Sequence, residues 1–116
     1  MSDVVILHNP RCSKSRDTLA LLTERGIKPT VVDYLNDPPD AVELERILEM
    51  LGLAPRELMR RNEAEYRALG LDDERLGHAE LIEAMRAHPR LIERPIVVAN
   101  GKAAIGRPPE SVLDIL

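Results

Sequence analysis

The sequence contains no phenylalanine and no tryptophan, and its only aromatic side chains are those of Tyr34 and Tyr66. Any hydrophobic core must therefore be built from aliphatic residues. Proteins that bind single-stranded nucleic acid stack the bases on aromatic side chains along a basic groove. Because this chain has so few aromatics and a formal net charge of -4, we expect no nucleic-acid partner.

Long apolar runs are also absent. The first apolar run extends only from Val4 to Leu7, far short of the roughly 20 residues of a membrane-spanning helix, and no basic stretch precedes it. The single cysteine, Cys12, cannot form an internal disulfide, so nothing indicates an oxidising compartment. We expect a cytoplasmic protein without membrane contact, folded as one domain over residues 1–116.

The start of the chain is patterned as strand, helix and strand. Residues 3–8 form a β-branched run that ends at Asn9-Pro10 and predicts a buried strand. Residues 13–25 have the leucine spacing of a helix, which Gly26 ends. Residues 29–34 predict a second strand. A strand–helix–strand unit of this length predicts two parallel strands.

The rest of the chain predicts a helical block, a hairpin and a last helix. Helical spacing recurs through residues 40–88, which we interpret as an insertion. Residues 95–99 and 102–106 predict two antiparallel strands, joined by the hairpin turn that Asn100-Gly101 favours. Residues 110–116 predict an amphipathic helix. This order predicts an α/β, thioredoxin-like fold: a mixed four-stranded sheet with a helical insertion between the second and third strands.

Cys12 lies where the first expected strand turns into the first helix. A helix N-terminus presents unpaired N–H groups and a partial positive charge, which favour bound anions and lower the pKa of a cysteine thiol. Arg11, Lys14 and Arg16 add positive charge, and the Ser13 and Ser15 hydroxyls can donate to sulfur or to an anion. The pattern predicts a nucleophilic thiolate that meets an anionic substrate.

Other interpretations of the cysteine can be compared by counting. A buried, inert cysteine fits poorly with such charged neighbours. A Cys-x-x-Cys disulfide motif is excluded because Ser15 stands where the second cysteine would be. A Cys-x5-Arg phosphatase loop is excluded because the residue at the arginine position is Thr18. His8 has two open roles, a structural side chain or a group that tunes the thiolate together with Ser15 and Arg16.

Three motifs are spaced along the chain. They are His8-Asn9-Pro10-x-Cys12-x-x-Ser15-Arg16, Glu93-Arg94-Pro95-Ile96-Val97-Val98 and Gly106-Arg107-Pro108, with Tyr34-Leu35-x-x-Pro38-Pro39 and Leu58-Met59-Arg60-Arg61-Asn62 between them. In this combination and order the sequence resembles the glutaredoxin-coupled arsenate reductase family over its whole length.

The resemblance implies roles for particular residues. Cys12 is the nucleophile that attacks arsenate, and Arg60, Arg94 and Arg107 are the substrate-binding arginines. The planar guanidinium suits this role because it pairs bidentately with oxyanions and keeps its charge. The resemblance also implies that Pro95 follows a cis peptide bond, as in other thioredoxin-type folds.

The implied activity is that of an arsenate reductase (glutaredoxin), an oxidoreductase that converts arsenate, or a similar oxyanion, to arsenite through a Cys12 thiol–arsenate adduct. Because the chain has no second cysteine, the electrons must come from outside. Glutathione is the implied co-substrate and glutaredoxin the implied partner that clears the mixed disulfide. We expect no bound cofactor and no metal, since His78 and His88 have no ligand cluster around them.

Departures from the family leave alternatives open. The stretch Arg11-Cys12-Ser13-Lys14 carries charge where dedicated arsenate-resistance members have small neutral residues, and the sequence ends at Leu116 where those members extend further. A housekeeping branch of the family is one alternative. An Spx-like, redox-responsive transcription regulator that binds RNA polymerase without turnover is another, although Ser15 replaces its second cysteine. A non-catalytic anion-binding domain is the third.

Overall fold

The structure, a computed structural model, describes residues 4–116. The chain divides into two compact units: one holds the described residues up to Asp37 together with Arg94–Leu116, and the other is Pro38–Glu93. The first unit consists of β1 (Val5–His8), α1 (Ser13–Glu24), β2 (Thr30–Asp33), β3 (Ile96–Ala99), β4 (Lys102–Ile105) and the 3-10 helix η2 (Pro109–Ile115). The second consists of α2 (Ala41–Leu51), α3 (Pro55–Leu58), α4 (Ala64–Ala68), α5 (His78–Ala87) and the 3-10 helix η1 (Pro89–Leu91).

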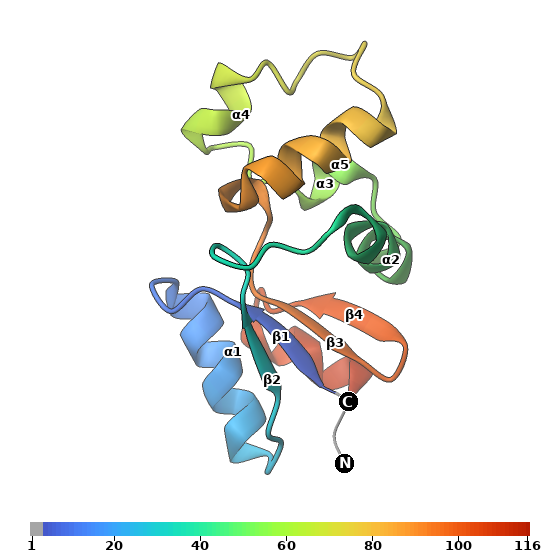
Figure 1. Cartoon of the computed structure of the whole chain (residues 1–116). Coiled ribbons are helices and arrows are strands. Elements are labelled where there is room, and N and C mark those ends of the chain that lie inside the picture. The colour runs from blue at the N-terminus through green and yellow to red at the C-terminus, as the bar shows by residue number, and fades with distance from the viewer. Residues whose placement is uncertain (1–3) are drawn as a thin grey trace. The chain divides into compact units, whose positions relative to one another are not determined.

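The first unit is built on a four-stranded sheet with the order β2-β1-β3-β4 (Figure 1). β1 pairs with β2 in parallel, and β3 is antiparallel to both β1 and β4. The mixed sheet, its strand directions and the α/β class are therefore confirmed. Asn100 and Gly101 have φ values of 56° and 73°, the left-handed backbone that a two-residue hairpin turn needs.

The register of the sheet determines which chain segments meet at its edge. Leu7 near the end of β1 pairs with Ile96 at the start of β3, and Ile96 pairs with Ile105 at the end of β4. The loop after β1, the segment before β3 and the segment after β4 consequently leave the sheet side by side. Residues around positions 12, 94 and 107 are thereby collected at one place.

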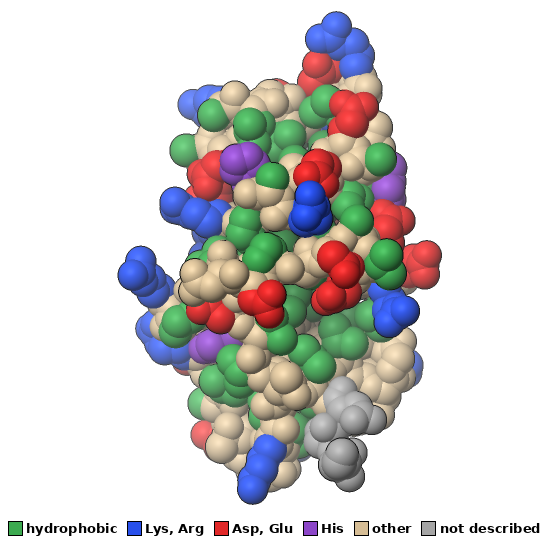
Figure 2. All heavy atoms as spheres, in the orientation of Figure 1, with side chains coloured by type: hydrophobic (Ala, Val, Ile, Leu, Met, Phe, Trp, Pro, Cys, Tyr) green, Lys and Arg blue, Asp and Glu red, His purple; other side chains and the backbone are tan. Residues whose placement is uncertain are grey.

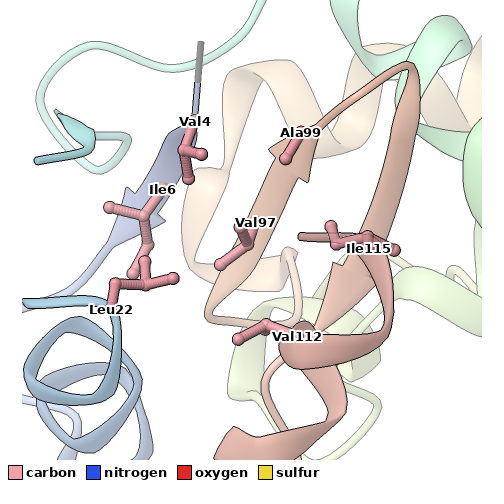
Figure 3. Packing of buried hydrophobic residues seen from close by; sticks show 7 residues of the cluster. All are labelled: Val4, Ile6, Leu22, Val97, Ala99, Val112 and Ile115. Carbon is pink, nitrogen blue, oxygen red and sulfur yellow. The ribbon is translucent and has the colours of Figure 1, made fainter. Parts of the chain in front are cut away.

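One face of this sheet carries the core of the unit. Alternate strand residues point to the same side, and they pack there against α1 and η2 (Figure 3). The cluster consists of Val4, Ile6, Leu22, Val97, Ala99, Val112 and Ile115. This cluster is all aliphatic, and it holds α1, and with it the β1–α1 loop, against the sheet. Tyr34 of the same unit is also fully buried, so the core as a whole is not purely aliphatic.

The last helix is of the 3-10 type. The pattern predicts an amphipathic helix over 110–116, and the structure has there the 3-10 helix η2, Pro109–Ile115. Its buried residues are Pro109, Val112 and Ile115, spaced by three, and a 3-10 helix has three residues per turn. In the 3-10 helix these three apolar residues therefore lie on one face.

The second unit is helical. α2 begins after Asp40, whose carboxylate accepts the Glu43 N–H at 2.8 Å, and ends at Gly52 with a φ of 69°. The side chains of Leu58 and Leu91 are fully buried within this unit. Met59 and Ile92 form an isolated antiparallel β-bridge. Within residues 4–116, no helix has the length and apolar character needed to cross a membrane.

Candidate active site

The loop between β1 and α1 is held by its own side chains. The Cys12 N–H donates to the Asn9 carbonyl at 3.0 Å, and the Arg11 N–H donates to Asn9 Oδ1 at 2.9 Å, as asparagine does in tight turns. Arg16 Nη1 donates to the Pro10 carbonyl at 2.9 Å. These contacts connect the first turn of α1 to the loop and fix the position of Cys12.

Cys12 is the N-cap residue of α1. Its backbone is extended, with φ -94° and ψ 122°, and its carbonyl accepts the Arg16 N–H at 3.0 Å. The N–H groups of residues 13–15 have no acceptor within the helix. The Cys12 side chain thus lies at the positive end of α1, a place suited to an anion, and the residue is 8% exposed.

Arg107 places a positive charge beside the sulfur. Its Nη2 lies 3.5 Å from Cys12 Sγ, while its Nε donates to the Arg94 carbonyl at 2.8 Å. The carbonyl orients the guanidinium, which is permanently charged and has five N–H donors. The same group can therefore contact the sulfur and an oxygen of a bound oxyanion. Cys12 is buried, as an inert cysteine would be, but its sulfur contacts a charged arginine side chain.

Arg94 and Pro95 lie at the same edge of the sheet. The Arg94–Pro95 peptide bond is cis, and so is the Arg107–Pro108 bond, which the sequence analysis did not anticipate. The Gly106 N–H donates to the Pro95 carbonyl at 2.9 Å. Arg94 is half-buried. Among the three arginines implied by the resemblance, Arg94 and Arg107 therefore belong to the unit that holds the cysteine.

Gly106 has a role that the sequence reasoning missed. A Cβ at this position would lie 2.8 Å from Pro95 Cγ and would overlap the hydroxyl of Thr18. Thr18 is fully buried on α1, and its hydroxyl donates to the Lys14 carbonyl at 2.8 Å. Only glycine lets the end of β4 approach α1 and Pro95 this closely. The glycine directly before the Arg107-Pro108 pair was the signal that could have indicated it.

Replacing Gly106 with alanine should destabilise the protein by about 1–3 kcal/mol, the usual cost of overpacking. Denaturant unfolding followed by circular dichroism measures the change. Thr18→Ala removes the threonine atoms that the new methyl group meets, so Gly106→Ala should cost clearly less in a Thr18→Ala background. An equal cost in both backgrounds would mean that the contact with Thr18 is not the cause.

His8 and Ser15 form a buried pair beneath the loop. His8 Nδ1 lies 2.6 Å from Ser15 Oγ, which also accepts the Asn9 N–H at 3.0 Å. Burial lowers the pKa of His8, Asp33 opposes this by raising it, and Arg16 lowers it further. A neutral His8 accepts the Ser15 hydroxyl proton at Nδ1 and carries its own proton on Nε2. The Ser15 hydroxyl is thus engaged with His8 and the loop, not with sulfur or an anion as expected.

The titration of His8 tests this arrangement. Its pKa should lie below the ordinary value of 6.5, so the folded state loses stability as the pH falls from 6.5 through the lowered pKa, where only the unfolded chain is readily protonated. Asp33→Asn should lower this pKa further and Arg16→Ala should raise it. NMR titration of the His8 imidazole resonances measures this pKa in the unmodified protein and in both variants. A midpoint at or above 6.5 in the unmodified protein would contradict the buried, neutral state of His8.

Arg60 lies in the helical unit, and the structure gives it a partner that sequence reasoning missed. Arg60 Nη1 pairs with Glu63 Oε1, and Glu63 Oε2 lies 3.5 Å from Arg90 Nη2. The Arg60 N–H donates to the Leu91 carbonyl at 2.7 Å. The i,i+3 spacing of Arg60 and Glu63 could have indicated the pair. The role of Arg60 at the cysteine stays a prediction.

Two further features of the described residues concern ligands. A cavity of about 420 Å³ lies in the helical unit, lined by Arg61, Asn62, Glu63, Ala64, Arg67 and Ala68. No group of three or more His, Cys, Asp or Glu side chains in residues 4–116 is arranged to hold a metal ion.

Comparison with known proteins agrees with this geometry. The model of the ArsC family matches residues 7–115. An arsenate reductase of Neisseria meningitidis serogroup A is 53% identical over 100% of both chains, and the Escherichia coli K12 protein YfgD is 58% identical over 97% of this chain and 96% of its own. The solved structure of an arsenate reductase from Vibrio cholerae is 54% identical and superimposes with a TM-score of 0.97, covering 99% of this chain and 98% of that one. A chain with this cysteine, these arginines and these relatives belongs to the ArsC family.

Proposed function

We propose that the protein is an arsenate reductase in which Cys12 attacks arsenate and glutathione completes the reduction. The observation that carries the proposal is the contact of Arg107 Nη2 with Cys12 Sγ, at the N-terminus of α1. A nucleophilic sulfur beside a fixed guanidinium and free helix N–H groups is suited to a tetrahedral oxyanion. Relatives at 53% and 50% identity are named arsenate reductases.

The first step joins sulfur to arsenic. The Cys12 thiolate attacks the arsenic atom of bound arsenate, an As–O bond breaks, and the oxygen leaves as water after taking up a proton. The product is a Cys12–S–arsenate adduct in which arsenic is still As(V). Arg107 and the N–H groups of residues 13–15 are placed to stabilise the negative charge on the oxygens, the kind of contribution that usually dominates such catalysis.

The second step transfers two electrons. The thiolate of glutathione attacks the Cys12 sulfur, an S–S bond forms as the S–As bond breaks, and arsenic leaves as As(III) in arsenite. The two sulfurs are oxidised and the arsenic is reduced, so the electrons balance. Glutaredoxin then attacks the sulfur of the bound glutathione and regenerates Cys12. This sequence is the one open to a chain with a single cysteine, and it fits the cytoplasm, where glutathione is available.

Arg94 and Arg60 complete the proposed binding site. The Arg94 carbonyl holds Arg107, and the Arg94 side chain starts from the same edge of the sheet. Arg60 comes from the helical unit and has N–H donors beyond the one that Glu63 engages. We assign both side chains to arsenate oxygens, since three guanidinium groups together balance the three negative charges of an arsenate dianion and the Cys12 thiolate.

A coupled assay tests the function. Purified protein, arsenate, glutathione, glutaredoxin and glutathione reductase are combined, and NADPH oxidation is followed together with arsenite formation. We expect oxidation that depends on arsenate and on glutaredoxin. Absence of arsenate-dependent turnover, combined with specific capture of an RNA polymerase subunit, would instead support the regulator. Oxyanion binding that survives Cys12→Ser without any turnover would support the anion-binding domain.

A further inference from the structure

The segment around Cys12 carries charge that the proposed reaction does not use. Residues 9–16 contain three basic residues, Arg11, Lys14 and Arg16, and no acidic one, in a chain with a formal net charge of -4. All three are exposed. Figure 2 shows basic side chains projecting at its left margin, where Figure 1 places the β1–α1 loop and the start of α1. The exposed side chains that flank Cys12 in residues 9–16 therefore include three cations and no anion.

Two of these side chains have no structural task within the described residues. Arg16 is used in the fold, because its Nη1 donates to the Pro10 carbonyl at 2.9 Å. The side chains of Arg11 and Lys14 form neither a hydrogen bond nor an ion pair with any part of the chain from residue 4 to 116. They flank Cys12 immediately before it and on the first turn of α1. Such cations are available to a molecule that arrives from solvent.

We propose that Arg11 and Lys14 bind the carboxylates of glutathione as it approaches Cys12 to break the arsenate adduct. This inference rests on the proposed function and adds the specificity for the second substrate. Glutathione is a small anionic peptide with two carboxylates and one ammonium group, so two cations flanking the target sulfur match its charges. Arsenate itself is accounted for by Arg107 and the helix N-terminus, which lie at the sulfur.

Glutathione sulfur bonds to Cys12 sulfur and the electron pair of the S–As bond leaves with arsenite. Arg11 and Lys14 take no part in electron transfer. They act as positioning residues that raise the local concentration of the anionic thiol and orient it, an electrostatic contribution that falls as salt is added.

The first test does not depend on arsenate. Cys12 is reacted with oxidised glutathione and, in a separate experiment, with the neutral 2-hydroxyethyl disulfide. In the first reaction the Cys12 thiolate attacks the S–S bond, which gives the Cys12–glutathione mixed disulfide and releases one glutathione. Intact mass spectrometry follows both reactions. The rate constant for oxidised glutathione is divided by the rate constant for 2-hydroxyethyl disulfide. This ratio should fall by about three- to tenfold in Arg11→Ala/Lys14→Ala, and in the unmodified protein it should fall with added salt.

A matched control separates local from total charge. Arg25 and Lys28 are exposed cations at the opposite end of α1, so Arg25→Ala/Lys28→Ala makes the same change in net charge away from the sulfur. This variant should keep the rate ratio of the unmodified protein. An unchanged ratio in Arg11→Ala/Lys14→Ala, or an equal fall in both double variants, would overturn the proposal.

Steady-state kinetics provide the second test. In the coupled assay, Arg11→Ala/Lys14→Ala should raise the KM for glutathione by about three- to tenfold and raise the KM for arsenate by clearly less. An equal rise in both KM values would show general attraction of anions and would overturn the assignment to glutathione. Failure of the proposed function is a different result, because the unmodified protein would then show the charge-dependent reaction with oxidised glutathione but no arsenate-dependent turnover.

Discussion

Cys12→Ser should abolish arsenate-dependent NADPH oxidation, with a loss of at least about a thousandfold that reaches the background of the assay. The physical reason is specific to sulfur. A serine hydroxyl is a far weaker nucleophile at neutral pH, and its oxygen cannot form the S–S bond through which the two electrons leave glutathione. Because no other cysteine exists in the chain, no second thiol can take over.

The control for this variant is its fold. Cys12 makes backbone bonds through its N–H and its carbonyl, and serine keeps both while being a favoured N-cap residue. Thermal unfolding of Cys12→Ser should therefore stay close to that of the unmodified protein. A folded Cys12→Ser protein that still reduces arsenate would remove the cysteine from the reaction.

The second large effect is expected at Arg107. Arg107→Ala removes the guanidinium that contacts Cys12 Sγ at 3.5 Å and should lower kcat/KM for arsenate by about 10²–10³-fold, the usual loss for one donor that stabilises an oxyanion. Arg107→Lys should recover part of this loss, because it keeps the charge but lacks the planar fork that holds both the Arg94 carbonyl and the sulfur.

Arg25→Ala is the matched control for Arg107. It removes an exposed arginine from the same unit, at the C-terminal end of α1, and should leave kcat/KM within about twofold, as a surface substitution away from the site. Steady-state measurements over a range of arsenate concentrations give the comparison. An Arg107→Ala enzyme as active as Arg25→Ala would show that the contact with sulfur has no part in turnover.

Local sequence signals predicted much of the fold because the physics behind them is local. The Asn100-Gly101 pair favours left-handed backbone, and the hairpin turn has it. Asp40 and Gly52 marked the two ends of α2, since one caps the first turn and the other adopts positive φ at the end. The type of the last helix could not be predicted, because a short apolar repeat does not distinguish 3.6 from three residues per turn.

The site was only partly predictable for a different reason. Cys12 could be located from its own neighbours, but its contact with Arg107 joins residues 95 positions apart and exists because Leu7, Ile96 and Ile105 are in register across the sheet. The restriction at Gly106 likewise arises from an approach to Thr18 and Pro95, which are distant in sequence. The Ser15 hydroxyl was assigned to sulfur or an anion because its buried partner His8 could not be placed from the pattern.

The central claim is that the Cys12 sulfur bonds to arsenic and then passes to glutathione. Intact mass spectrometry of the protein after incubation with arsenate and glutathione, with glutaredoxin left out, tests it most directly. We predict that Cys12 gains one glutathione only when arsenate and glutathione are both present, with one arsenite released for each modified protein. An unmodified Cys12 beside released arsenite, or the same modification by reduced glutathione without arsenate, would contradict the account.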